Sequence, residues 1–125
     1  MHSPVLVPAL MAVLLLSACQ STPPPVPAAS PPDWKALGTE PFWGFTLRGS
    51  DLVYSTPENQ AGDRIVVIRN PAAGGEDVTG ELAGQPFRAE IREGSCSDGM
   101  SDMRYAWRVA LTVGGETRKG CARLP

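Results

Sequence analysis

The chain has 125 residues with 11 basic and 13 acidic side chains, a formal net charge of −2 and one histidine, His2. This nearly neutral balance without a basic cluster excludes a nucleic-acid-binding surface and argues against attraction to anionic lipids. We expect His2 to be removed with a signal peptide. The mature chain would then have no histidine, and so no Ser-His or Cys-His catalytic pair.

The first predicted element is a secretion signal. Residues 5–16 are mostly apolar, fewer than the roughly 20 that a membrane-spanning helix needs, and typical of a signal-peptide core. The next residues, Leu16-Ser17-Ala18-Cys19, resemble the lipobox of bacterial lipoproteins. That resemblance implies a diacylglyceryl group on the Cys19 sulfur and cleavage just before it, so that residues 1–18 are the signal peptide. The alternative is an ordinary secretory signal that contains a cysteine.

Lipidation would also decide where the protein resides. Two or more fatty chains hold a protein firmly in a bilayer, and a lipobox cysteine carries at least two. Gln20 follows the cysteine, whereas many Gram-negative lipoproteins retained in the inner membrane have Asp there. We therefore expect an outer-membrane anchor, with the rest of the chain on the periplasmic face and the membrane as a partner through the lipid.

A proline-rich tether follows the lipobox. Residues 20–32 contain six of the chain's 13 prolines and no charged side chain. Such a segment has too little apolar bulk to offset its ordering entropy, and it favours extended polyproline II geometry. We assign residues 19–32 to the lipidated cysteine and tether, and residues 33–125 to one periplasmic domain.

The domain shows the alternation of β-strands. Predicted strands cover 42–49, 51–55, 64–69, 78–82, 86–93, 104–113 and 116–124. Segment 64–69 is apolar on both faces at its centre, as in a buried strand. Gly114-Gly115 predicts a two-residue turn with positive φ between the last two strands. The pattern predicts an all-β domain, a small antiparallel barrel or sandwich of about seven or eight strands.

Two cysteines of the domain form an even pair. With Cys19 lipidated, Cys96 and Cys121 remain in an oxidising compartment, which favours a disulfide over a reactive or metal-binding pair. Closing this loop should contribute about 3 kcal/mol. The turn at 114–115 places Arg108 opposite Cys121 on the solvent side. Either a bulge at Gly120 turns Cys121 inward, which we favour, or the disulfide lies outside and straps the Cys96 loop over the sheet.

Residues 96–105, CSDGMSDMRY, are the densest unusual stretch. Asp98 and Gly99 are a turn signal, and the carboxylates of Asp98 and Asp102 can accept backbone N–H bonds that stiffen the loop. Asp98 and Asp102 alone lack the ligand density of a calcium loop.

A soft-metal site is a second interpretation of the same stretch. Met100 and Met103 with Cys96 offer sulfur ligands for Cu(I). We favour the simpler interpretation, in which the methionines pack under the loop and Cys96 is disulfide-bonded. The prediction is therefore no metal and no cofactor.

Three sequence blocks carry a family resemblance. The blocks are Gly38-Thr39-Glu40-Pro41-Phe42-Trp43, Cys96-Ser97-Asp98-Gly99-Met100-Ser101-Asp102 and Gly120-Cys121-Ala122. Together they resemble a family of small, functionally uncharacterised bacterial lipoproteins. These proteins are sometimes grouped with META or heat-shock HslJ-type envelope domains. The resemblance implies an all-β envelope domain with a Cys96–Cys121 bond, and it supplies no activity. It also implies that Pro41 starts the first strand and that Phe42 and Trp43 pack the barrel base.

A looser resemblance concerns residues 101–105. Ser101-Asp102-Met103-Arg104-Tyr105 is similar to the Ser-Gly-x-x-Tyr loop of membrane-bound inhibitors of c-type lysozyme, with Asp102 in place of the glycine. The resemblance implies that Ser101 and Arg104 could contact the catalytic carboxylates of a cell-wall hydrolase, the arginine through a charge-assisted bidentate pair. A solvated charge at the end of a strand is the simpler interpretation of Arg104.

The sequence thus predicts a non-enzymatic lipoprotein whose β-domain binds or supports envelope components. The candidate partners are an envelope protein or, as the alternative function, a lysozyme-type hydrolase. The candidate binding loop comprises Asp98, Met100, Ser101, Asp102 and Arg104.

Overall fold

The structure is a computed structural model that describes residues 1–5, 8, 17–25 and 29–125. The predicted signal-peptide core, residues 5–16, lies almost entirely outside these ranges. Within them we find no helix with the length and apolarity that crossing a bilayer requires. The regular structure of the described residues is all β.

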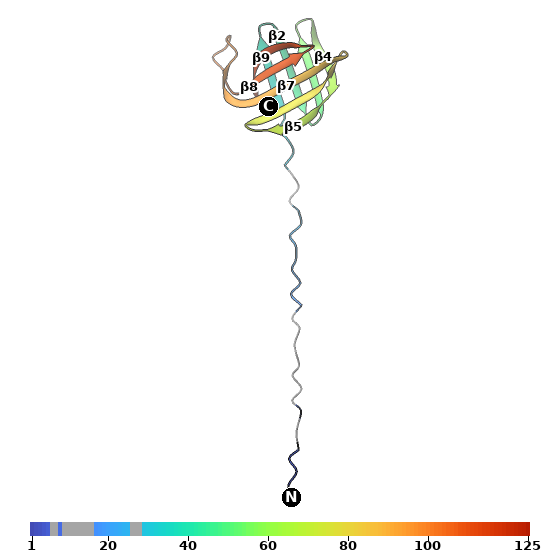
Figure 1. Cartoon of the computed structure of the whole chain (residues 1–125). Helices are drawn as coiled ribbons and strands as arrows, with labels where there is room; N and C mark the ends of the chain where they lie inside the picture. Colours follow the sequence, from blue (N-terminus) through green and yellow to red (C-terminus); the bar gives the residue numbers. More distant parts are fainter. Residues whose placement is uncertain (6–7, 9–16, 26–28) are drawn as a thin grey trace.

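Nine strands make up one antiparallel sheet (Figure 1). They are β1 Trp34–Thr39, β2 Phe42–Arg48, β3 Asp51–Thr56, β4 Asn59–Val66, β5 Ile68–Ala72, β6 Gly75–Leu82, β7 Gln85–Ser97, β8 Arg104–Val113 and β9 Glu116–Arg123. Their order in the sheet is β4-β3-β2-β1-β9-β8-β7-β6-β5. The predicted all-β antiparallel class is confirmed, with slightly more strands than expected, because β1 was not predicted and segment 64–69 contributes to two strands.

The sheet rolls up because its two edge strands are halves of one segment. A single residue, Val67, separates β4 from β5, and its N–H donates to the carbonyl of Ser50 at 2.9 Å. β6 passes close to this corner, since a Cβ on Gly80 would lie 3.1 Å from the carbonyl oxygen of Val66. We call the rolled sheet the barrel. Rolling brings the two edge strands together at Val67, and among the described residues no ladder pairs β4 with β5.

The segment at this corner corrects one expectation. Val67 is 4% exposed, but its neighbours Val66 and Ile68 are 73% and 67% exposed. Segment 64–69 is therefore not buried on both faces. In a single-layer barrel the outer face of a strand meets solvent, so alternate residues of even an apolar run lie outside.

The inner faces of the strands form the core. Its largest fully buried side chains are Phe45, Phe87, Leu47, Leu52, Ile91, Leu111 and Val78. Phe87 makes edge-to-face contacts with Phe45 and with Tyr54, at ring-centroid distances of 6.2 and 5.9 Å. One aromatic cluster thus ties β2 and β3 to β7 across the interior, at the spacing that aromatic pairs prefer.

Trp43 explains two of the glycines in the sequence blocks. A Cβ on Gly38 would lie 2.1 Å from the Trp43 Nε1, and one on Gly120 would lie 2.5 Å from the Trp43 Cζ2. The indole therefore fits only because both positions lack a side chain. Phe42, expected beside Trp43 in the barrel base, is instead 50% exposed. Successive strand residues point to opposite faces, so Phe42 and Trp43 cannot both point inward.

Candidate functional site

The disulfide is present and lies on the outside of the barrel. Cys96 and Cys121 are bonded with their Cα atoms 5.6 Å apart. The turn at Gly114-Gly115 has positive φ at both residues, as predicted, and it sets Arg108 opposite Cys121. The favoured bulge at Gly120 is wrong, because the β8–β9 register runs through that residue without a shift.

The bulge occurs instead on the strand of the other cysteine. The β7–β8 register shifts between Glu93 and Cys96. Beyond this shift the chain lies against β1 and β8, since Thr39 donates from Oγ1 to the Asp98 carbonyl at 3.0 Å and Arg108 donates from Nε to the Ser95 carbonyl at 3.1 Å. We call residues 94–103 the disulfide loop. Figure 1 shows it projecting to one side of the barrel.

Asp98 organises the disulfide loop, as the sequence predicted. Its Oδ1 accepts the backbone N–H groups of Ser101 at 2.8 Å and Met100 at 2.9 Å, and its Oδ2 accepts the Ser101 hydroxyl at 2.7 Å. These hydrogen bonds, those from Ser101 first, lower the pKa of Asp98 to about 2, because they favour the charged carboxylate. The exposed Asp102 takes no part in this arrangement.

The methionines of the loop do not pack beneath it. Met100 is 70% exposed and Met103 is 48% exposed. The loop is held instead by Asp98 and by the disulfide. The sulfur of Cys96 is in the disulfide and cannot serve as a thiolate ligand. In the described part of the chain, no three His, Cys, Asp or Glu residues are grouped as metal ligands.

Ser101 lies exposed within the disulfide loop, and Arg104 lies exposed directly after it, at the start of β8. The Ser101 hydroxyl donates to Asp98 and accepts the N–H of Met103 at 3.3 Å. A partner that recruits this hydroxyl must therefore compete with a carboxylate already in place. Arg104 begins β8 opposite Ser97.

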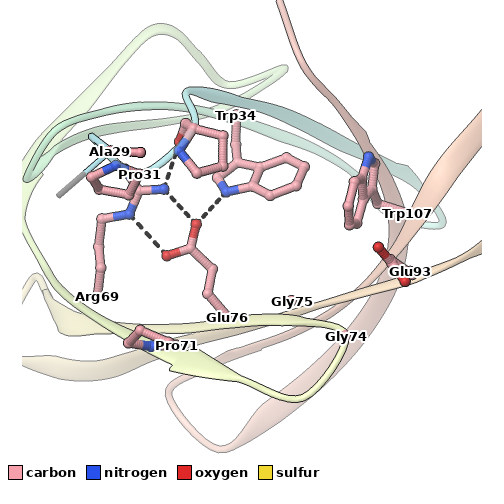
Figure 2. A pocket seen from close by; sticks show the side chains of 11 residues that line it. Ala29, Pro31, Trp34, Arg69, Pro71, Gly74, Gly75, Glu76, Glu93 and Trp107 are labelled. Carbon is pink, nitrogen blue, oxygen red and sulfur yellow. Dashed lines mark hydrogen bonds and ion pairs between the residues drawn. The ribbon is translucent and has the colours of Figure 1, made fainter. Parts of the chain in front are cut away.

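A second candidate site, which the sequence did not reveal, is a pocket of about 570 Å³ where the tether joins the barrel. We call it the tryptophan pocket, and the lining residues used below are Trp34, Arg69, Glu76, Glu93 and Trp107, together with tether residues Ala29, Pro31 and Pro32. Figure 2 shows it from close by. Its volume is within the range of small-molecule sites.

A buried ion pair forms one side of the pocket. Arg69 of β5 pairs with Glu76 of β6, and each side chain is only 9% exposed. Arg69 Nε donates to Glu76 Oε2 at 2.9 Å, while Arg69 Nη2 and the Trp34 indole N–H both donate to Glu76 Oε1 (Figure 2). The hairpin of β5 and β6 and the distant strand β1 thus meet at one carboxylate. A buried charge of this kind is tolerated only when paired and hydrogen-bonded.

Two tryptophans form the apolar part of the tryptophan pocket. Trp34 of β1 and Trp107 of β8 meet edge to face, with ring centroids 4.9 Å apart and planes at 76°. Trp34 is buried, whereas Trp107 is only partly buried, so its indole is accessible from the pocket. Figure 2 shows the Glu93 carboxylate beside Trp107.

The tether forms one wall of the pocket. Arg69 Nη2 donates to the Pro32 carbonyl at 2.5 Å, and its Nη1 donates to the Gly49 carbonyl at 3.2 Å. Ala29 and Pro31 also line the pocket. The last residues assigned to the tether thus contact the barrel.

Sequence reasoning missed this site because its partners are far apart. Trp34 and Glu76 are 42 positions apart, and Trp34 precedes every predicted strand. One signal was available in the sequence. Arg69 lies two positions after the buried Val67, and Glu76 lies two positions before the buried Val78, so both charged residues share the inward face of their strands. Recognising it required knowing that β5 and β6 turn at Ala72 and Gly75.

Comparisons with family models, curated proteins and solved structures found no match to this chain. The interpretation of the two sites therefore depends on their own chemistry.

Proposed function

We propose that this protein is a bacterial lipoprotein, anchored in the outer membrane through Cys19, whose periplasmic barrel binds or supports envelope components without catalysis. One observation supports the anchor most strongly. Of the three cysteines, two are joined in the disulfide and Cys19 is the free, exposed one. It is also the cysteine that follows Leu16-Ser17-Ala18.

The disulfide supports an extracytoplasmic location. Structural disulfides persist in oxidising compartments and are rare where thiols are kept reduced. A bond that fixes an exposed loop to the outer face of the barrel would be lost in a reducing cytosol. The periplasm is therefore the compartment that best suits the folded domain.

Binding suits the two candidate sites better than catalysis. The mature chain would lack histidine, and the carboxylates nearest the tryptophan pocket are either ion-paired, as Glu76 is, or exposed, as Glu93 is. A rigid pocket with aromatic walls and a rigid loop are features of recognition surfaces.

Membrane fractionation of cells that express the full chain tests this proposal. Wild-type protein should sediment with the outer membrane, and Cys19→Ser should appear in the soluble fraction because it cannot be acylated. The control is Ser30→Ala, which changes the tether but leaves the lipobox intact and should remain membrane-bound. Identical distribution of wild type and Cys19→Ser would overturn the proposal.

Inhibition of a lysozyme-type hydrolase is the second candidate function. The observation that favours it is an exposed loop, held by Asp98 and the disulfide, that carries Ser101 and leads directly into the exposed Arg104. Preorganisation of this kind reduces the entropy lost on binding. The test is turbidity clearing of cell walls by lysozyme with and without the protein. Clearing rates that do not change at a large molar excess would dismiss this function.

A further inference from the structure

The ion pair of the tryptophan pocket has few hydrogen bonds left for a ligand. Arg69 donates to Glu76 and to the carbonyls of Pro32 and Gly49. Both carboxylate oxygens of Glu76 accept hydrogen bonds, from Arg69 and from the Trp34 indole. The two charges also cancel each other. An incoming molecule therefore finds this side of the pocket already satisfied.

Glu93 is different. It lies opposite Trp107 in the β7–β8 register, and its backbone N–H donates to the Gly74 carbonyl at 2.7 Å, which holds it at the pocket. Its side chain is exposed, and among the ion pairs of the described residues it has no partner. The pocket thus carries one uncompensated negative charge next to an accessible indole (Figure 2).

This combination selects for a positive charge on an apolar stem. A cation is attracted by the face of an indole within about 6 Å of its centre, and a carboxylate beside the ring adds a charge-assisted contact. Pro31 and Pro71 supply apolar wall against which methylene groups can lie. An anion would be repelled by Glu93, and a neutral ligand would cover its carboxylate without pairing it.

We propose that the tryptophan pocket binds an aliphatic ammonium group, with the charge between Trp107 and Glu93 and the stem along the prolines. The group can belong to a lysine side chain or to a free alkylamine. Because Ala29 and Pro31 form part of the wall, the bound group also contacts the tether. The inference goes beyond the anchoring function and does not depend on acylation.

The test is an NMR titration of the ¹⁵N-labelled full chain carrying Cys19→Ser, which keeps the protein out of membranes. The chain has three tryptophans, so three indole N–H signals report separately on Trp34, Trp43 and Trp107. The probes are N-acetyl-lysine amide, its isostere N-acetyl-norleucine amide, which lacks the ammonium, and cadaverine as a free diamine.

We expect N-acetyl-lysine amide to shift the Trp107 signal most and the Trp43 signal least, with a Kd of about 1 mM. The norleucine isostere should bind at least about tenfold more weakly, since it lacks the charge. Cadaverine binding as tightly as the lysine probe would indicate that the ammonium alone suffices. Binding of the lysine probe alone would point to a polypeptide as the source of the ammonium.

Two matched variants complete the experiment. Glu93→Gln removes the charge but keeps the shape, and it should weaken the lysine probe about tenfold while barely changing the folded spectrum. Glu81→Gln makes the same change at the far end of β6, at an exposed carboxylate, and should leave the affinity unchanged. Equal affinity for the lysine and norleucine probes, no shift at Trp107, or an unaltered affinity in Glu93→Gln would overturn the proposal.

Discussion

The disulfide loop and the tryptophan pocket are both held rigidly, but by interactions of different range. The loop is ordered by Asp98, which bonds residues two and three positions away, and by one covalent bond. The pocket is ordered by Glu76, whose partner Trp34 is 42 positions away. The comparison teaches that short-range hydrogen bonds leave a recognisable sequence signature, whereas a site assembled by sheet register does not.

The largest effect should come from the long-range site. Glu76→Ala leaves the Arg69 guanidinium buried without its carboxylate, which should lower the free energy of unfolding by about 3 to 5 kcal/mol. Chemical denaturation measures this directly. Asp77→Ala is the matched control, because it removes the carboxylate of the next residue in β6, whose ion pairs are more exposed than the Arg69–Glu76 pair. It should cost about 0 to 1 kcal/mol. Equal losses in the two variants would show that the Arg69–Glu76 pair adds nothing beyond a surface pair.

The covalent bond of the loop should have the next largest effect. Replacing Cys96 and Cys121 together by Ala should lower the free energy of unfolding by about 3 kcal/mol, because the unfolded chain regains the entropy of an open loop. Thermal unfolding of the oxidised protein, the reduced protein and the double variant provides the measurement. The reduced protein should match the double variant. An unchanged Tm in both would show that Asp98 alone holds the loop.

Gly38→Ala tests the packing around Trp43. A Cβ at this position would overlap the indole and lie 2.9 Å from the Lys119 carbonyl oxygen, so we expect a loss of about 1 to 3 kcal/mol. Gly44→Ala, also on the β1–β2 hairpin, is the control, since its Cβ would meet only the Ala36 carbonyl at 3.4 Å and the Ser55 Oγ at 3.7 Å. If Gly38→Ala is no more destabilising than this control, the close approach of Trp43 is not required.

The smallest effect concerns Asp98 and acid. Because its pKa in the folded protein is lowered from 3.8 to about 2, its contribution to stability is present above about pH 4 and is lost as the pH falls towards 2. The backbone amide of Met100 should report a titration with a midpoint near pH 2 by NMR. Ser101→Ala removes one donor and should move that midpoint upward. A midpoint near 3.8 in the unaltered protein would contradict the loop geometry.

Much of the fold could be predicted from residues close in the sequence. Gly114-Gly115 fixed the β8–β9 register, and the alternation in 86–93 and 104–113 located β7 and β8. The strand β1 was not predicted, because Lys35-Ala36-Leu37-Gly38 has no clear alternation. Its inward positions are identified only by contacts: Trp34 against Glu76, and Gly38 beneath Trp43.

The candidate site was predictable to a lesser extent. The pairing of Cys96 with Cys121 and the role of Asp98 were expected and are present. We favoured an inward Cys121, but the disulfide lies on the outer face. The reason is that the irregularity in strand register occurs in β7 and not at Gly120. Which strand accommodates an extra residue depends on contacts across the sheet. The sequence around Cys96 and the sequence around Cys121 do not contain this information.

Anchoring at Cys19 is the central claim, and mass spectrometry of the protein isolated from native membranes tests it most directly. We predict an amino-terminal peptide that begins at Cys19 and carries a diacylglyceryl group on its sulfur. A native protein that retains Met1, or one whose Cys19 has a free thiol, would contradict this account.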